Sequence, residues 1–325
     1  MKRAVLIINP ISGTQSKEDL EATVVERLGQ SGIEVEVKHT GGHGDATLFA
    51  ARAATEGVDI VLAAGGDGTV NEAAAALCGT ETVLGILPCG SGNGLARHLG
   101  LPIDPVEALG VIEKGTVIGA DYGTANGHKF FCTFGVGFDA AVSFQFAGMK
   151  RRGKLSYIRS ALEEFLKYRP EHYRIEINGQ ELTQKAFLVA VCNASQYGNN
   201  AYIAPHASIT DGLLDVTIVH SGNPVQTALV GFDMMTGYIN RNTLIRTIKA
   251  SNLRIWRDKE GPAHIDGEPI MMAPLLEISC EKGKLKVFAP KIERPFRPIL
   301  TPARAMIDDL RIAISHFIPP KLPKP

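Results

Sequence analysis

The chain has 325 residues, of which 45% are hydrophobic, and it carries 34 basic and 34 acidic side chains with no formal net charge. This length is enough for two hydrophobic cores of ordinary size, and the balanced charge disfavours an extended nucleic-acid groove. The five cysteines are scattered without a CxxC pair, which argues against a disulfide framework and a zinc site and favours a reducing cytoplasm.

Short β-branched runs alternate with longer helical patterns in the first third of the chain. The runs cover residues 3–10, 33–40, 58–66 and 82–90, and the helical patterns between them cover residues 16–32, 44–57 and 69–79. Strands that are separated by single helices favour right-handed crossovers and a parallel sheet covered on both faces. The sequence therefore predicts a doubly wound α/β domain over residues 1–120.

The pattern changes near residue 120 to a series of alternating strands. Turn pairs such as Asn178-Gly179 separate them, which is typical of antiparallel hairpins in a β-sandwich. We therefore expect a second, mainly antiparallel domain over residues 121–290. A basic, partly helical insertion at residues 148–170 interrupts it.

A glycine-rich stretch, GGDGTVNE, follows the third predicted strand from Gly65 to Glu72. It lies at the carboxyl end of a parallel strand, where doubly wound folds bind ligands. The glycines bring backbone N–H groups close to a ligand, and Thr69 or Asn71 can cap the following helix, whose start favours phosphate. A carboxylate at Asp67 beside a phosphate implies metal or base chemistry.

Three further strand-end loops carry small polar residues before a helix. The loop after the first strand contains Asn9 and Gly13, and the loop after the fourth strand contains a second glycine cluster from Gly90 to Gly94. The loop after the second strand contains Thr40, with Asp45 as the expected helix cap. Because the carboxyl ends of parallel strands meet at one edge of a sheet, the four loops are expected to converge there on a phosphate group.

Familiar nucleotide and hydrolase motifs are missing from the sequence. It contains no GxxxxGK[ST], no HRD and DFG pair, no HExxH and no GxSxG. The stretch GVGFDA from Gly135 resembles a dinucleotide fingerprint, but it lies in the β-rich half without a following βαβ unit, so we do not assign it that role.

Five motifs occur in an order that resembles the diacylglycerol kinase catalytic family, specifically its bacterial lipid-kinase branch. They are GGDGTVNE, LPCGSGNGLARHLGLP, GVGFDAAV, YGNNAYIAPHASITDGLLDV and HIDGEP, and the resemblance spans Met1 to Pro290. It implies ATP-dependent phosphorylation of a lipid hydroxyl, with the nucleotide between a Rossmann-like N-terminal domain and a β-sandwich C-terminal domain.

The resemblance also assigns nucleotide contacts. It places them on the loop after the first strand, on Thr40, on the glycine loop around Asp67 and on Ser91, in agreement with the interpretation from the residues alone. The predicted ATP-binding set comprises Asn9, Pro10, Ile11, Ser12, Gly13, Thr40, Gly65, Gly66, Asp67, Gly68, Thr69, Asn71, Glu72, Gly90, Ser91, Gly92 and Asn93.

A magnesium site is implied by the same resemblance. It places Mg²⁺ on the Asp211 side chain together with backbone oxygens of Ser208 and Leu213, a set of hard oxygen donors that suits this ion. Thr210 stands where many relatives have another acid, which weakens the expected site.

HIDGEP supplies two carboxylates, because Asp266 and Glu268 flank a glycine at a strand turn and can face the same side. The pKa of a lipid hydroxyl lies far above neutrality, so an acid must accept its proton during phosphoryl transfer. We predict that Asp266 or Glu268 is this base. Asp67 would organise metal and phosphates from the other domain, and the base and metal roles are interchangeable at this point.

Two positions in the sequence bear on which lipid accepts the phosphoryl group. Asp139 either orients the substrate head group or is a buried structural aspartate. Sphingoid-base kinases resemble this pattern but have a further acid two positions on, where this chain has Ala141. A neutral lipid such as diacylglycerol is therefore favoured over a sphingoid base.

Two other function classes remain as alternatives. NAD kinases share the GGDG loop, but they are not expected to carry GSGNGLAR or the DGE strand in this form. A regulatory lipid-binding protein without activity would keep the fold and lose the carboxylates, whereas Asp67, Asp211, Asp266 and Glu268 are all present.

The segment from Lys291 to Pro325 contains seven Lys or Arg against three Asp or Glu. Its apolar residues have helical spacing, with Pro302 in the expected first turn. They are Ala303, Met306, Ile307, Leu310, Ala313, Ile314 and Phe317. We expect this helix to dock on its own domain, on a second subunit of a homodimer or, as the sharper hypothesis, on a membrane beside the basic residues 150–154.

No apolar run in the sequence approaches the roughly 20 residues of a membrane span. The sequence thus predicts a cytoplasmic protein that is not integral to the membrane and works with a lipid substrate at the inner membrane surface as a peripheral protein.

Overall fold

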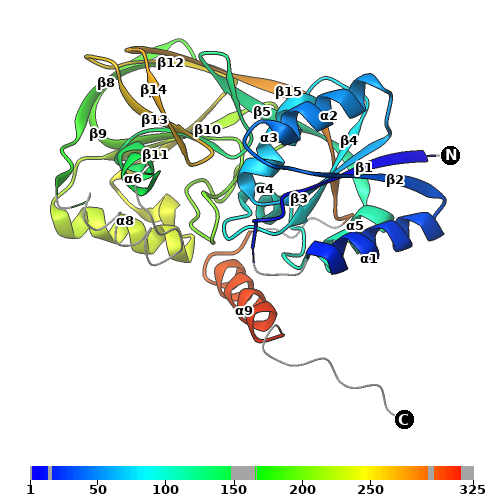
Figure 1. Ribbon diagram of the computed structural model, residues 1–325. Helices are drawn as coiled ribbons and strands as arrows, with labels where there is room; N and C mark the ends of the chain where they lie inside the picture. The colour runs from blue at the N-terminus through cyan, green and yellow to red at the C-terminus, as the bar shows by residue number, and fades with distance from the viewer. Residues whose placement is uncertain (1, 14–16, 148–164, 166, 292–295, 316–325) are drawn as a thin grey trace.

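The computed structural model describes residues 2–13, 17–147, 165, 167–291 and 296–315. Four parallel strands form its N-terminal half, in the order β2 (Ile33–His39), β1 (Lys2–Ile8), β3 (Ile60–Gly65) and β4 (Val83–Pro88) (Figure 1). The chain leaves β1 for β2 on one side and returns to β3 on the other. The gap between the carboxyl ends of β1 and β3 is thus the topological switch point, where folds of this kind bind ligands.

Helices cover both faces of this parallel sheet. Val5 and Ile7 face the core shared with α2 (Asp45–Thr55) and α3 (Asp67–Leu77). Leu6 and Ile8 face the opposite core, shared with α1 (Lys17–Gln30) and α5 (Pro105–Lys114). Because side chains alternate along a strand, burial on both faces requires the continuous apolar runs seen in the sequence.

Antiparallel strands build the second half around their own core. The tight turn between β8 and β9 is made by Asn178 and Gly179, both with positive φ, as a two-residue hairpin requires. The strands are β5 (Thr116–Ala125), β6 (His128–Phe130), β7 (Thr133–Gly137), β8 (Glu171–Ile177), β9 (Gln180–Cys192), β10 (Leu214–His220), β11 (Ile245–Ala250), β12 (Asn252–Trp256), β13 (Gly261–Ile265), β14 (Glu268–Met272) and β15 (Leu275–Ala289).

The two halves share one sheet in the described part of the chain. β15 pairs with β5 along most of its length and meets β4 at a single parallel pair, Val287 with Leu84. The predicted boundary at residue 120 lies inside β5, and the one at residue 290 lies directly after β15. The predicted fold class, a parallel α/β half followed by a mainly antiparallel β half, is confirmed.

The described residues also form α4 (Gly94–His98), α6 (Phe138–Ala147), α8 (Pro224–Thr236) and the 3₁₀ turn η1 (Ile239–Arg241). The sequence analysis missed α8. Its signals were present, because Asn223 and Gln226 form a capping box, a proline follows the cap, and Gly237 ends the helix with positive φ.

The C-terminal helix α9 spans Leu300–Ser315 and begins three residues before the predicted apolar pattern. Phe317 and most of the predicted insertion, namely residues 148–164 and 166, lie outside the described residues. Among the helices that the structure describes, none has both the length and the apolar character needed to cross a bilayer.

Candidate active site

Three glycine-containing loops meet at the carboxyl edge of the parallel sheet. A Cβ atom on Gly90 would lie 2.6 Å from the Cα of Gly66, and one on Gly13 would collide with the carbonyl oxygen of Cys89. Gly13 also has a φ of 67°, which favours glycine. The close approach of these backbones therefore depends on the absence of side chains and leaves their N–H groups near one another, as the four-loop prediction required.

The loop after β1 is fastened to the glycine loop by Asn9. Its backbone N–H donates to Ala64 O at 2.9 Å, and its side-chain amide donates to the Thr69 hydroxyl at 3.2 Å. At the tip of the same loop the side chain of Ile11 is 90% exposed. The N–H of Thr40 donates to Ile8 O at 2.9 Å, which brings the loop after β2 to this edge of the sheet.

Asp67 joins the two glycine loops. One carboxylate oxygen accepts the N–H of Asn93 at 2.9 Å, and the other accepts the N–H of Gly94 at 2.7 Å. Burial raises the pKa of this carboxyl group, while the two N–H donors act in the opposite direction. The side chain that the sequence predicted to be catalytic therefore also holds the start of α4 against the start of α3.

The helix caps differ from the sequence predictions. α3 begins at Asp67 with Gly66 as its N-cap, so the predicted cap by Thr69 or Asn71 is wrong, because both residues lie inside the helix. The predicted cap by Asp45 is also wrong: Gly44 is the N-cap of α2, and the Asp45 carboxylate accepts N–H groups from the preceding loop.

Glu72 accepts N–H groups at the start of α2, whose own N-cap residue, Gly44, has no side chain. It accepts the N–H of Gly44 at 2.9 Å and that of Ala46 at 3.2 Å. A negative charge near a helix N-terminus is favourable, because the first N–H groups have no partner within the helix. This residue of the predicted ATP-binding set therefore fixes the position of α2 against α3.

Asn71 connects α3 to the other half of the molecule, because its side-chain amide donates to the Asp266 carboxylate at 3.0 Å. Asp266 also accepts the backbone N–H groups of Phe131, Cys132 and Thr133 at 2.7 to 2.8 Å. Burial raises the pKa of Asp266 to about 6, against the effect of these N–H donors. The carboxylate thus serves four donors and holds its turn in place.

Glu268 is exposed and opens β14, two residues after Asp266. The turn between them contains Asp266 with a φ of 48° and Gly267 with a φ of 87°. Of the two predicted carboxylates, Asp266 therefore accepts hydrogen bonds from backbone and side-chain donors, whereas Glu268 is exposed to solvent.

A buried polar chain supports this turn from behind. The Gly267 N–H donates to Nδ1 of His264 at 3.3 Å, so the proton of the neutral imidazole lies on Nε2, which is 3.1 Å from the Asp139 carboxylate. The Tyr197 hydroxyl donates to the same oxygen at 2.9 Å. A Cβ atom on Gly135 would collide with both Asp139 and His264, which explains a glycine at this position.

Sequence reasoning missed His264 and Tyr197. His264 is 1% exposed and Asp139 is 7% exposed. The other Asp139 oxygen accepts the N–H of Ala140 at 2.8 Å. Asp139 was expected either to orient the substrate head group or to be a buried structural aspartate, and both of its carboxylate oxygens are engaged within the protein. No local pattern connects positions 139, 197 and 264, because three separate segments bring them together.

Asp211, the predicted magnesium ligand, lies beside a lysine. One carboxylate oxygen accepts the Leu213 N–H at 3.0 Å, and the other is 2.7 Å from the Lys249 ammonium group. Lys249 also lies 3.2 Å from the buried Asp215 carboxylate, its direct partner across β10 and β11. The described residues include no cluster of three or more metal-binding side chains, and two of the predicted donors are backbone oxygens.

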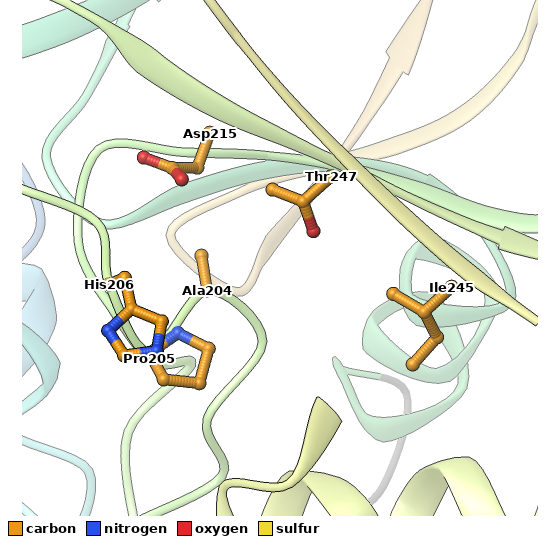
Figure 2. Close-up of a pocket in the computed structure, with 6 residues that line it drawn as sticks. All are labelled: Ala204, Pro205, His206, Asp215, Ile245 and Thr247. Atoms are coloured by element: carbon orange, nitrogen blue, oxygen red, sulfur yellow. The ribbon is translucent and has the colours of Figure 1, made fainter. Parts of the chain in front are cut away.

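A cavity of about 320 Å³ opens beside Asp215 (Figure 2). It shares no lining residue with the glycine loops or the Asp266 turn. Its walls are formed by Ala204, Pro205, His206, Asp215, Ile245 and Thr247. The candidate active site is therefore defined by the convergence of loops and hydrogen bonds and not by this cavity.

Comparison with known proteins identifies the family. The diacylglycerol kinase catalytic domain matches residues 3–125, and the YegS C-terminal NAD kinase beta sandwich-like domain matches residues 132–289. The diacylglycerol kinase of Bacillus subtilis (strain 168) is 30% identical over 280 residues, which cover 84% of this chain and 92% of that protein. The chain belongs to the family of diacylglycerol kinases and YegS-like lipid kinases.

Other members of this family support the assignment. The diacylglycerol kinase of Mycobacterium tuberculosis (strain ATCC 25618 / H37Rv) is 30% identical over 301 residues, or 89% of this chain and 96% of that protein. A crystal structure of a protein assigned as a diacylglycerol kinase in Bacillus anthracis str. Sterne has a TM-score of 0.74 at 26% identity, covering 89% of this chain and 98% of that one. The chain is a lipid kinase, and its family implies the use of ATP.

Proposed function

We propose that this lipid kinase transfers the γ-phosphoryl group of ATP to a hydroxyl of a neutral lipid such as diacylglycerol. The observation that carries the proposal is the hydrogen bond between Asn71 and Asp266 at 3.0 Å. It joins the helix that starts in the glycine loop to the turn that bears Glu268. A phosphate cradle and an exposed carboxylate on two sides of one site are what phosphoryl transfer to an alcohol needs.

The nucleotide would bind over the three convergent loops. The N-terminus of α3, an 11-residue helix, offers unpaired N–H groups to phosphate oxygens. The exposed hydroxyl-bearing Ser91 lies in the second glycine loop, and the exposed side chain of Ile11 offers an apolar contact for a base. Asp67, Glu72 and Asn93 would act by holding these loops, since their side chains already accept or donate within the protein.

Glu268 is the stronger of the two candidates for the general base. The Asp266 carboxylate accepts four hydrogen bonds, so it would have to give up at least one of them to take the hydroxyl proton. Glu268 is exposed and can reach a hydroxyl. As the γ-phosphoryl group leaves ADP, Glu268 would take the proton of the attacking hydroxyl, and Asp266 would keep the turn in place.

Asp139 supports the choice of a neutral acceptor. Its two carboxylate oxygens accept hydrogen bonds from His264, Tyr197 and the Ala140 N–H. A carboxylate engaged in this way would have to break buried hydrogen bonds to bind the ammonium group of a sphingoid base. With Ala141 at the neighbouring position, this arrangement favours a neutral lipid.

Magnesium would bind at Asp211 with the backbone oxygens of Ser208 and Leu213. A carboxylate and two carbonyl oxygens are donors that Mg²⁺ prefers, so the residues fit the ion, although the Lys249 ammonium already pairs with Asp211. When bound, the ion would supply positive charge near this loop. We infer that Mg²⁺ and Lys249 compete for the same carboxylate.

A magnesium titration without nucleotide, followed by thermal unfolding, tests this site. Asp211→Ala should lose the response to Mg²⁺, and Lys249→Met should increase it, because the competing cation is gone. An Asp211→Ala titration that overlays that of the wild type would remove magnesium from this loop.

The proposed reaction is tested by incubating the purified chain with ATP and Mg²⁺ and one of three acceptors: a short-chain diacylglycerol, sphingosine or NAD⁺. Mass spectrometry should show one phosphate added to the diacylglycerol. Phosphorylation of sphingosine or NAD⁺ in its absence would overturn the choice of acceptor. Consumption of ATP without any phosphorylated acceptor would overturn the proposed reaction.

Diacylglycerol resides in a bilayer, so we further propose that the chain works as a peripheral protein at a membrane surface. The C-terminal helix was also predicted to contact a second subunit, in which case its exposed side chains would pack against protein and not against lipid. The structure allows these two roles to be compared.

A further inference from the structure

Two helices that contact one another, α8 and α9, expose large apolar side chains. On α8 these are Val225, Leu229 and Phe232, and around α9 they are Leu300, Ile307 and Leu310; all six are at least half exposed. Figure 1 shows α8 and α9 below the sheets, with α9 beyond the end of α8. We call these six side chains the apolar helix surface.

On α8 the exposed apolar residues lie on one face, because positions 225, 229 and 232 follow helical spacing. Thr227 and Val230, on the opposite face, are buried. α8 therefore packs Thr227 and Val230 against the protein and exposes the apolar face that contains Val225, Leu229 and Phe232 to solvent. An amphipathic helix that only packs on its own domain has the reverse orientation.

α9 shows the same orientation. Positions 300, 307 and 310 share one face, and Asp309 on the other face is 2.8 Å from the Arg97 guanidinium group. Asn200 donates to the second Asp309 oxygen at 3.3 Å. α9 thus docks on its own chain through an ion pair, while its predicted apolar face points outwards.

Short contacts link the apolar helix surface to the candidate active site. Arg97, which holds Asp309, also donates to the carbonyl oxygen of Gly92 in the second glycine loop at 3.0 Å. The start of α9 is tied to the end of α8, because the Ile299 N–H donates to Thr236 O at 2.8 Å. The surface therefore has a fixed position relative to the predicted phosphate site.

Charges around the surface distinguish a bilayer from a second copy of the chain. Arg304 and Arg311 are exposed and lie four residues after Leu300 and Ile307, on the flank of the apolar face. Asp309 is neutralised by Arg97, which leaves Asp308 as the exposed acid of the described part of α9. Two exposed arginines thus stand against one exposed acid on α9; an anionic bilayer complements this excess of positive charge, whereas a two-fold dimer would bring two such excesses together.

We propose that α8 and α9 form a surface that docks on an anionic lipid bilayer and so holds the active site next to acceptor lipid. An apolar stripe flanked by arginines is the pattern of helices that lie in the membrane interface. This inference rests on the proposed function, because it assumes that the acceptor is a membrane lipid.

The test uses the full chain and vesicles of phosphatidylcholine with and without phosphatidylglycerol. Two double variants, Leu229→Ser with Phe232→Ser and Ile307→Ser with Leu310→Ser, should each weaken sedimentation with anionic vesicles by about tenfold or more. Leu48→Ser is the matched control, because Leu48 and Phe232 are both 64% exposed and Leu48 lies on α2, in the other half of the chain. It should bind vesicles like the wild type.

Two further measurements separate docking from folding and charge. Melting temperature and turnover on a dispersed short-chain diacylglycerol should stay unchanged in both double variants, while turnover on vesicle-borne diacylglycerol falls. Arg304→Gln with Arg311→Gln should reduce binding to anionic vesicles only and weaken its dependence on salt.

Three outcomes would overturn the inference. The first is vesicle binding that survives both double variants, and the second is an equal loss in Leu48→Ser. The third is a wild-type dimer that the serine variants convert to monomers, because the surface would then be a subunit interface. If vesicle binding is lost as expected but no lipid is phosphorylated under any condition, docking stands and the proposed function fails.

Discussion

The two sides of the candidate active site are held in place by different kinds of contact. On the side of the parallel sheet, glycines let backbones touch, as between Gly66 and Gly90. On the side of the β13–β14 turn, polar side chains do the positioning: the half-buried Asp266 holds three consecutive N–H groups, and the buried His264 holds Gly267.

The contrast follows from the role proposed for each side, which is phosphate binding on one side and proton transfer on the other. A phosphate group is bound well by backbone N–H groups, and glycines expose them without any side chain in the way. A base must be a single side chain at one place, so its turn needs supports that fix it from several directions. We therefore expect substitutions on the two sides to change different kinetic constants.

The largest effect is expected for Glu268→Gln on the side of the turn. Turnover should fall about 10³-fold, because the variant cannot take the hydroxyl proton, while KM for ATP and the melting temperature stay the same. The measurement is a steady-state assay with short-chain diacylglycerol.

The control is Glu260→Gln, which removes an exposed carboxylate at the opposite end of the β13–β14 hairpin and should be silent. If Glu268→Gln keeps most of the wild-type turnover while Asp266→Asn loses it, the base is Asp266 and the division of roles proposed here is wrong.

Asp67→Asn probes the glycine side. The carboxamide would turn an N–H group towards the N–H of Asn93 or Gly94, so the second glycine loop should lose its position. We expect kcat/KM for ATP to fall about 10²-fold, together with a lower melting temperature, because the contact is structural as well as functional.

Asp104→Asn is the matched control for Asp67→Asn, because Asp104 also accepts two backbone N–H groups but lies at the start of α5, outside the four strand-end loops. It should change the melting temperature more than the kinetics. Equal kinetic losses in the two variants would show that Asp67 has no special role at the nucleotide.

His264→Phe separates positioning from catalysis. It removes the acceptor of Gly267 and the partner of Asp139, so the turn should loosen and kcat should fall by about tenfold, with KM for ATP unchanged. His264→Gln keeps a donor for Asp139 and should recover part of kcat.

A purely structural histidine would give another pattern. In that case both variants would melt at lower temperature and the kcat of the folded enzyme would equal that of the wild type, with no rescue by glutamine.

The smallest effect concerns the free energy of unfolding at acid pH. We expect His98, on the glycine side, and Asp266, on the side of the turn, to change it in opposite directions as the pH falls. Burial lowers the pKa of His98, next to the second glycine loop, to about 4. Between pH 6.5 and 4 the unfolded chain binds a proton that the folded chain does not, so this residue removes stability as the pH falls. Urea unfolding should show a loss of roughly 1 to 2 kcal/mol between pH 7 and 5 that His98→Gln diminishes.

Asp266 contributes in the other direction. Its pKa is raised to about 6, so the folded chain binds a proton that the unfolded chain does not between its ordinary pKa and pH 6. Its contribution to stability is present at low pH and is lost as the pH rises through 6. Asp266→Asn should therefore steepen the acid loss that His98→Gln reduces, and a change of equal sign in the two variants would contradict these assignments.

The sequence by itself determined the parallel half of the fold. Its apolar runs and helical patterns each lie within about ten to fifteen residues, and burial on both faces of a parallel sheet makes those runs unambiguous. The four strand-end loops followed from the same pattern, because parallel strands end at a common edge. The capping box of α8 was equally local, and it could have been found from Asn223 and Gln226.

Only the tertiary structure decided which carboxylate is free. Asp266 and Glu268 look alike in HIDGEP, and they differ because residues 131–133 and Asn71 reach one of them and not the other. The outward orientation of the apolar face of α9 was hidden for the same reason, since it depends on Arg97, which lies 212 positions from Asp309. Backbone preference and apolar spacing act over a few residues, whereas the partner of a buried charge is chosen by packing between distant segments.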